Sequence, residues 1–314
     1  LGIAHKNLGD ARRAIQFHEQ ALAIDRDIGD RRGEGADLGN LENAYADLGD
    51  ARRAIGYYEQ TLAIDREVGN RRGEGNDLGN LGSAYLQLGD TRRAIGYFEQ
   101  ALVIAREIGD RRGEGINLAN LGLAYADLGD AQRAIGYYEQ ALVIARRTGD
   151  RHVEGTALGN LGIAYRQLGN ASRAIQFHKQ QLVISRDIGN QRGESATLGN
   201  LGSDYLQLGD ARRAIQHYQQ RLEIAREIGD RRGEGKTLGN LGLAYADMGD
   251  IRRAIRYHEQ GLAIAREIED AMGSAIGSFN LANEHMKLGE RTRALELAQE
   301  AARIFAQIDH AQYA

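Results

Sequence analysis

The sequence predicts an all-α solenoid, a stack of about eight helix-turn-helix units of which the first is incomplete. Three observations carry this prediction. Nearly the same residues return every forty positions, each period holds two amphipathic helical patterns, and Gly-Asp pairs separate the patterns. Residues 81–85, Leu-Gly-Ser-Ala-Tyr, return at 121–125 as Leu-Gly-Leu-Ala-Tyr. Such a period indicates small units that each need a neighbour to bury their apolar face.

The period at 71–110 shows the two helical patterns. Its first half places Leu78, Leu81, Tyr85 and Leu88 at spacings of 3, 4 and 3, which is the apolar stripe of a helix. Its second half carries a broader stripe, made of Ala94, Ile95, Phe98, Ala101, Leu102, Ala105 and Ile108. The sequence therefore predicts two helices per unit and no strand.

Turn residues set the helix boundaries. Gly89 predicts a left-handed C-terminal stop and Asp90 an N-cap, and the same pair recurs at nearly every boundary. The first helices are expected near 31–48, 71–88, 111–128, 151–168, 191–208, 231–248 and 271–288, with a remnant at 1–8. The second helices are expected near 10–28, 50–68, 90–108, 130–148, 170–188, 210–228, 250–268 and 290–308.

No linker interrupts the pattern, so residues 1–314 are expected to form one continuous right-handed array. Its units are 1–30 (partial), 31–70, 71–110, 111–150, 151–190, 191–230, 231–270 and 271–310. In the last unit Phe279 replaces a Gly and Glu269 replaces the boundary Gly. This unit reads as a C-terminal cap or as the start of a junction. Because the chain opens halfway through a repeat, a fragment of a longer protein is expected.

Glycines inside the first helices run against helix propensity, at about 1 kcal/mol each relative to Ala. Gly79 and Gly82 flank the apolar stripe. They allow either close packing of neighbouring helices or close approach of a ligand backbone.

The pattern of residues 71–110 resembles the tetratricopeptide repeat. Leu81-Gly82, Tyr85, Ala94, Phe98 and Ala101 stand at the spacing of that family, although Leu78 stands where the family often has Trp and Arg106 replaces the usual proline. The forty-residue length, with the signatures Gly-Asn-Leu-Gly-x-Ala-Tyr and Ile-Gly-Asp-Arg, is similar to partner-of-Inscuteable proteins and to arrays in bacterial multidomain proteins. The resemblance implies protein–protein interaction and leaves the partner open.

Composition excludes several classes of site. There is no cysteine, so disulfides, zinc ribbons and thiol nucleophiles are excluded, and a cytoplasmic location is expected. The 40 Lys and Arg against 44 Asp and Glu give a formal net charge of −4, which argues against nucleic-acid and membrane partners. No apolar run approaches the ~18 residues of a membrane helix. No cofactor, bound metal or enzymatic activity is expected.

A candidate binding face lies on the first helices, opposite their buried side. Its centre is Asn in every unit: Asn40, Asn80, Asn120, Asn160, Asn200, Asn240 and Asn280. An amide offers two donors and an acceptor, which suits pairing with a peptide backbone. In tetratricopeptide arrays this side lines the concave groove, and an asparagine ladder grips extended peptides in kinesin light chains. The resemblance implies the same role here.

The asparagines also have two possible origins that involve no ligand. Each Asn could bond to a carbonyl of the adjacent repeat and set only the repeat spacing, or recent duplication could have copied an unused residue.

Specificity is expected from columns that differ between units. These stand four before, three after and seven after each Asn: Asn43, Asn76, Ser83, Gln87, Ile116, Leu123, Asp127, Ile163, Gln167, Ser203, Gln207, Lys236, Leu243 and Asp247. Apolar pockets are expected around Ile116, Leu123 and Ile163, and again at Leu243. The aspartates in the last column favour a partly basic extended peptide with aliphatic anchors.

The remaining motifs are typical of structural roles. The basic pairs at the starts of the second helices, such as Arg52-Arg53, indicate a solvated outer face shared with acids. Histidines such as His178 occupy an aromatic column and lack metal-ligand spacing. Gly33-Glu34-Gly35 lacks the residues of a phosphate loop. Asp204 replaces a buried Ala, so it needs a partner or an exit to water; it marks either a local binding feature or drift in one copy.

The sequence favours a non-catalytic module that binds an extended peptide or a disordered segment. One alternative is the sensor or regulatory arm of a larger bacterial signalling NTPase or caspase-like protease. A further alternative is a self-assembling structural array that associates through the incomplete first repeat.

Overall fold

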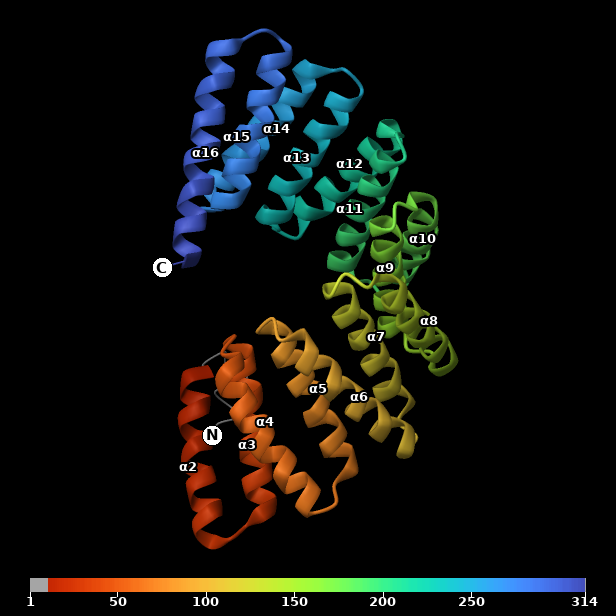
Figure 1. Ribbon diagram of the computed structural model, residues 1–314, viewed down its shortest axis with the longest axis vertical. Coiled ribbons are helices and arrows are strands. Elements are labelled where there is room, and N and C mark those ends of the chain that lie inside the picture. The colour runs from red at the N-terminus through yellow and green to blue at the C-terminus, as the bar shows by residue number, and fades with distance from the viewer. Residues whose placement is uncertain (1–10, 314) are drawn as a thin grey trace. The chain divides into compact units, whose positions relative to one another are not determined.

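Residues 11–313 are described by a computed structural model of the chain, which contains fifteen α-helices and no strand over that range. The helices divide between two compact units, unit 1 (Leu1–Asn160) and unit 2 (Leu161–Ala314) (Figure 1). The all-α solenoid of helix-turn-helix repeats is confirmed. The remnant helix expected at 1–8 lies outside the described residues.

The helix bounds repeat at intervals of forty residues. Unit 1 contains α2 (Ala11–Ile28), α3 (Arg31–Asp47), α4 (Ala51–Glu67), α5 (Arg71–Gln87), α6 (Thr91–Glu107), α7 (Arg111–Asp127), α8 (Ala131–Thr148) and the start of α9 (Arg151–Gln167). Unit 2 contains the end of α9, α10 (Ala171–Asp187), α11 (Gln191–Gln207), α12 (Ala211–Glu227), α13 (Arg231–Asp247), α14 (Ile251–Glu267), α15 (Ala271–Lys287) and α16 (Arg291–Tyr313).

The expected helices agree with the observed ones to within one or two residues, except at the C-terminal end. Helix α16 continues to Tyr313, whereas the expectation ended at residue 308. No Gly or Pro stands between 308 and 313 to stop it.

The turns form as the sequence predicts. Gly89 has a φ of +78°, and the Asp90 side chain accepts a hydrogen bond from the backbone nitrogen of Arg93 at 3.2 Å. At the boundary where Gly is missing, Glu269 itself takes the left-handed conformation, with a φ of +55°. A side chain with a Cβ atom is strained there, so this turn stores a local cost.

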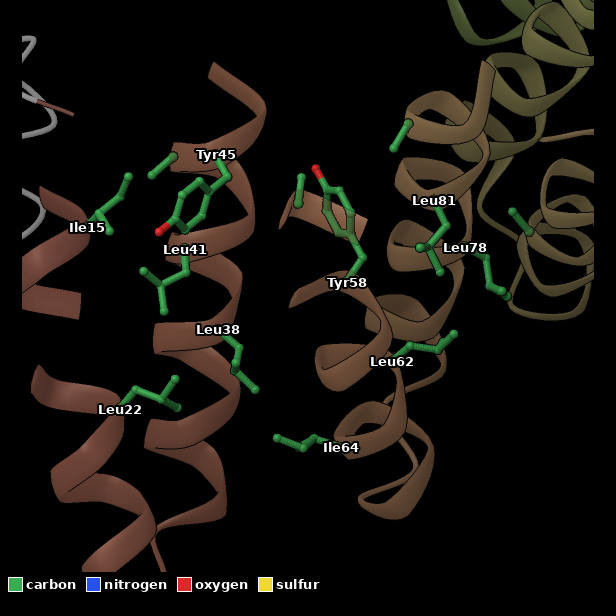
Figure 2. Close-up of a cluster of buried hydrophobic side chains, with 14 of the residues drawn as sticks. Ile15, Leu22, Leu38, Leu41, Tyr45, Tyr58, Leu62, Ile64, Leu78 and Leu81 are labelled. Atoms are coloured by element: carbon green, nitrogen blue, oxygen red, sulfur yellow. The ribbon is translucent and has the colours of Figure 1, made fainter. Parts of the chain in front are cut away.

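Leucines on the inner side of the first helices form the core of unit 1. Leu38, Leu41, Leu78 and Leu81 are at most 1% exposed, and the ring of Tyr58 packs among them (Figure 2). In unit 2 the equivalent core residues include Leu198, Leu201, Leu238, Leu241 and Tyr218. The same columns are therefore buried in both units.

The glycine at position 82 and its equivalents let a ring of the second helix pack against the first helix. A Cβ atom on Gly82 would lie 2.6 Å from the ring of Phe98, and one on Gly122 would lie 2.5 Å from that of Tyr138. Close helix packing therefore accounts for this column of glycines.

The outer face carries a repeated aromatic stack. Tyr85 of a first helix stacks on Tyr97 of the following helix, with ring centroids 5.3 Å apart, and the guanidinium of Arg93 lies 5.4 Å from the Tyr85 ring. The second Arg of a basic pair thus covers an aromatic ring as well as facing water, as Arg53, Arg213 and Arg253 also do.

Candidate functional site

The seven asparagines lie on one side of the first helices, in the middle of each helix. All seven are half-buried, because the leucine that follows each Asn turns into the core while the amide reaches the surface. Together with the three variable columns they form what we call the ladder face. Within each unit this face presents amides at a constant position on successive first helices.

Six of the seven amides make no side-chain hydrogen bond within the described part of the chain. The exception is Asn200, whose Oδ1 accepts from Nη1 of Arg166 at 3.3 Å. None of the seven bonds to a backbone carbonyl of an adjacent repeat among residues 11–313. The donors and acceptors of the other six amides are not engaged by any group of the described residues.

The apolar members of the variable columns are exposed to different extents. Ile116 and Leu123 in unit 1 are 40% and 46% exposed, and Leu243 in unit 2 is 42% exposed. Ile163 is half-buried. Exposed aliphatic side chains beside free amides are suited to hold the side chains of a bound peptide.

Several polar members of these columns already have partners. Asn43, Ser83 and Ser203 donate to the carbonyls four residues back in their own helices. Asp127 Oδ2 accepts from Thr91 Oγ1 at 2.5 Å, and Gln207 Nε2 donates to the carbonyl of Arg166 at 3.4 Å. The exposed members for which no such bond forms within the described residues are Asn76, Gln87, Gln167, Lys236 and Asp247.

In unit 2 the ladder face opens into a cavity of about 560 Å³ between α12, α13, α14 and α15. It brings together five members of the ladder face: Lys236, Asn240, Leu243, Ile276 and Asn280. Leu262 and Ile276 add apolar surface to its wall. An aliphatic pocket was expected at Leu243, and the structure shows a cavity there with cationic side chains beside it.

Arg221 also lines this cavity and was missed from the sequence. It stands in a column of the second helices that otherwise reads Ala21, Thr61, Ala101, Ala141, Gln181, Gly261 and Ala301. The sequence signal for Arg221 is its charge, because the other residues at this position of the repeat are uncharged and mostly small. The candidate face predicted from the sequence consists of first-helix residues only, so it does not include this second-helix position.

Asp204 has two partners inside unit 2. Its Oδ2 atom lies 2.5 Å from Nδ1 of His178, and its Oδ1 accepts from Nη1 of Arg166 at 3.2 Å. Asp204 and His178 are fully buried. His178 is therefore a hydrogen-bonding residue as well as an aromatic replacement, and His18 likewise pairs with Asp37 at 2.9 Å.

A second buried polar cluster lies in unit 1. Glu42 stands where most other units have Gly and the last has Ala282, and Thr61 Oγ1 donates to its Oε2 at 3.2 Å. Burial raises the pKa of Glu42 to about 8, and the nearby Asp77 carboxylate contributes to that rise. Burial also raises the pKa of Asp77 to about 7. Both groups hold their protons at a pH where exposed carboxyls are ionised.

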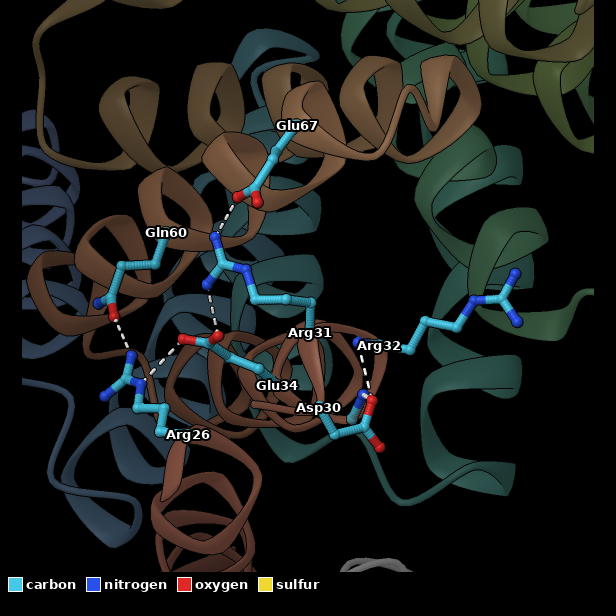
Figure 3. Close-up of polar contacts among 8 residues, drawn as sticks. Arg26, Asp30, Arg31, Arg32, Glu34, Gln60 and Glu67 are labelled. Atoms are coloured by element: carbon cyan, nitrogen blue, oxygen red, sulfur yellow. Dashed lines mark hydrogen bonds and ion pairs between the residues drawn. The ribbon is translucent and has the colours of Figure 1, made fainter. Parts of the chain in front are cut away.

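The Gly33-Glu34-Gly35 motif lies in the first turn of α3. Glu34 is buried, with its two oxygens bound by Arg26 Nε at 2.9 Å and by Arg31 Nη1 at 2.5 Å (Figure 3). Arg31 also forms an ion pair with Glu67 on α4, through its Nη2 atom. The hydrogen bond from Arg26 lowers the pKa of Glu34 against the opposing effect of burial. This ion-pair clip is structural and does not resemble a phosphate loop.

No group of three or more His, Asp or Glu side chains is placed to hold a metal ion among the residues that the structure describes. Within the same residues no helix is long and apolar enough to cross a membrane.

Solved structures share this fold. RapI in its apo form is 16% identical, over 88% of this chain and 99% of that one, with a TM-score of 0.71. A signal transduction ATPase with numerous domains from Pyrococcus horikoshii, which has a tetratricopeptide repeat sensor, is 19% identical over 98% of this chain and 49% of that one, with a TM-score of 0.70. A Rap protein complexed with Competence and Sporulation Factor is 15% identical over 94% and 86%, with a TM-score of 0.63. At these identities the likeness shows the fold alone.

No curated protein matches the chain in sequence. The family model described as tetratricopeptide repeat matches residues 1–67, 43–107, 114–187 and 193–267, which together make up most of the sequence. The chain belongs to the tetratricopeptide repeat family.

Proposed function

We propose that the chain is a non-catalytic protein–protein interaction module whose ladder face binds an extended peptide or a disordered segment of a partner. The asparagines pair with the peptide backbone, and the variable columns select its side chains. The cytoplasmic location expected from the cysteine-free sequence is part of this proposal, as is a single continuous array over residues 1–314.

The observation that carries the proposal is the state of the ladder amides. Six of them recur at one position, half-buried and without a hydrogen bond among residues 11–313. Amides without partners on successive first helices offer donors and acceptors to the backbone of a bound peptide. A Rap protein with this fold is known in complex with Competence and Sporulation Factor.

The test begins with a library of random dodecapeptides displayed on phage, selected against the whole chain. The affinity of the best peptide is then measured by fluorescence anisotropy for the wild type and for the variant Asn80→Ala/Asn120→Ala/Asn240→Ala. Each lost hydrogen bond costs about 1 kcal/mol, so three lost bonds weaken binding by about 100-fold. Asn200 is left intact because it also contacts Arg166.

The matched control places three alanines on the outer face of the same repeats: Arg92→Ala, Gln132→Ala and Arg252→Ala. All three native side chains are exposed. Binding by this control is expected to equal that of the wild type. If the asparagine variant binds the peptide as tightly as the wild type, or if the control loses as much affinity, the asparagines do not bind the peptide backbone.

A second candidate function is the sensor arm of a larger signalling ATPase. The Pyrococcus horikoshii ATPase has a tetratricopeptide repeat sensor, and this chain covers 49% of it. Sequencing the gene on both sides of the segment tests this candidate, since an adjoining ATPase domain supports it and its absence removes it.

Self-assembly through the first repeat is the third candidate. Light scattering over a range of protein concentrations tests it, and a mass that stays at one chain at every concentration removes it.

A further inference from the structure

Arg221 is a half-buried cation without a carboxylate partner. Among the described residues no Asp or Glu oxygen lies within 4 Å of its guanidinium, and its Nε atom is buried without a hydrogen-bond partner. Burial lowers the pKa of Arg221. Nearby arginines are satisfied, since Arg226 and Arg231 both bind Glu234. A buried charge left unpaired is costly, so an anion supplied from outside stabilises this arrangement.

The position of Arg221 puts it at the junction of two cavities. One is the 560 Å³ cavity described above, and the other, of about 430 Å³, is also lined by Arg192 and Arg231. The missing side chain of Gly199 makes room for the guanidinium, because a Cβ atom there would overlap Nη1. The Arg221 side chain therefore lines both cavities.

The surrounding charge favours an anion. Arg232 and Lys236 line the larger cavity beside Arg221. The two acids on the cavity walls are engaged at helix N-termini, where Asp230 accepts from the Gly233 nitrogen at 2.8 Å. Asp270 accepts from the Gly273 nitrogen at 2.9 Å and is 3.9 Å from Arg232. The cations thus outnumber the acids. The charge of Asp230 raises the pKa of Arg221 against the larger effect of burial, but no ion pair joins Arg221 to an acid among the described residues.

A neutral polar group completes the wall of the larger cavity. His258 is 1% exposed, and both of its ring nitrogens lack a hydrogen-bond partner. Burial lowers its pKa to about 4, so the ring is uncharged at neutral pH. Leu243, Leu262 and Ile276 supply apolar surface next to it. The cavity combines an unpaired cation, an unpaired imidazole and an aliphatic wall.

We propose that Arg221 binds the carboxylate of an Asp or Glu side chain of the peptide, while an aliphatic residue next to that acid fills the adjoining cavity. This inference rests on the proposed function and adds the side-chain chemistry of the partner at unit 2. It replaces, for this unit, the partly basic peptide expected from the sequence. A bidentate guanidinium–carboxylate pair is the strong form of this interaction, and shielding from water strengthens it.

The same phage library is selected in parallel against the wild type and Arg221→Ala. The variant is expected to fold, because Ala101 and Ala141 occupy the equivalent position. Peptides selected by the wild type are expected to share an Asp or Glu beside an aliphatic residue. Peptides selected by Arg221→Ala are expected to keep the aliphatic residue and lose the acid.

Coupling between Arg221 and the acid is then measured with one selected peptide and its Glu→Gln or Asp→Asn form. The change is expected to weaken binding to the wild type at least ~10-fold and to leave binding to Arg221→Ala unchanged. Gly199→Ala, which carries the side chain found at Ala119, displaces the guanidinium without altering net charge and is expected to reduce the preference for the acid. Arg212→Ala removes an exposed charge and keeps the preference.

The outcomes separate the two proposals. Selected peptides without a shared acid, or an acid preference that survives in Arg221→Ala, overturn this inference and leave the ladder intact. A library that yields no binding peptide overturns both.

Discussion

The Nδ1 atom of His178 lies 2.5 Å from the Oδ2 atom of Asp204, and both side chains are completely buried. Asp204 departs from its repeat column, as does Arg166, which binds the other oxygen of Asp204. His178 stands where the units on either side have Tyr138 and Tyr218. Three replacements from two neighbouring repeats meet at one place. Because Arg166 and His178 are the partners of the buried Asp204 carboxylate, the three replacements act as one compensated change of the core.

Asp204→Ala restores the side chain of the neighbouring units but removes the partner of two polar groups. It is expected to destabilise the protein by about 3 kcal/mol, because a buried partner is left unpaired. The triple variant Arg166→Ala/His178→Tyr/Asp204→Ala restores all three columns and is expected to recover most of that loss. Thermal unfolding followed by circular dichroism compares the two. A triple variant no more stable than the single one contradicts the compensation.

Stability is expected to depend on pH through Glu42 and Asp77. Because folding raises their pKa values from 4.5 to about 8 and from 3.8 to about 7, the folded state binds more protons than the unfolded state between these limits. The free energy of unfolding that these two groups contribute is therefore fully present below about pH 4, and it is lost as the pH rises towards 8.

Urea unfolding of the wild type and of Glu42→Gln/Asp77→Asn, at about pH 5 and about pH 8, measures this effect. The double variant is expected to lose less stability than the wild type over the interval. Glu59→Gln/Glu99→Gln, which changes two exposed acids, is the control and keeps the wild-type slope. If all three proteins lose the same stability between the two pH values, the pH dependence does not come from Glu42 and Asp77, which would falsify the prediction.

Glu269→Gly is expected to stabilise the protein by about 1 kcal/mol, since Gly adopts the left-handed conformation of this turn without strain. The reverse change, Gly229→Glu, meets a φ of +69° with no atom within 4 Å of its Cβ position. It is expected to cost a similar amount for the same conformational reason. The urea concentration at the midpoint of unfolding is measured for the wild type and both variants. A lower midpoint in Glu269→Gly than in the wild type contradicts the expectation.

Gly122→Ala and Gly136→Ala place the same methyl group in different surroundings. At Gly122 it lies 2.5 Å from the buried Tyr138 ring, whereas at Gly136 nothing lies within 4 Å. The first change is expected to destabilise by about 1–3 kcal/mol. The second is expected to stabilise by about 0.5–1 kcal/mol, because Ala is the better helix former. Both shifts are read from thermal unfolding, and a stabilising Gly122→Ala excludes the packing role.

The helices and turns could be predicted because each depends on residues close in sequence. Gly89 and Asp90 define a boundary by themselves, and Leu78 and Leu81 define a buried side. The Arg166–Asp204 pair and the unpaired Arg221 could not be predicted in the same way. A repeat pattern shows which residues occupy equivalent positions. Contacts between side chains at non-equivalent positions depend on three-dimensional packing, which the pattern does not show.

The arginine–glutamate clip returns with nearly the same geometry from Arg26–Glu34 to Arg226–Glu234, whereas the last unit has Ser274 in place of the glutamate. Arg66 Nε lies 2.9 Å from Glu74, and Arg226 Nε lies 2.8 Å from Glu234, four periods later. Up to Glu234, the same ion pair therefore joins each repeat to the next. Recombination between copies within the gene can insert or delete whole forty-residue modules without creating a new junction, so the length of the array can change in discrete steps.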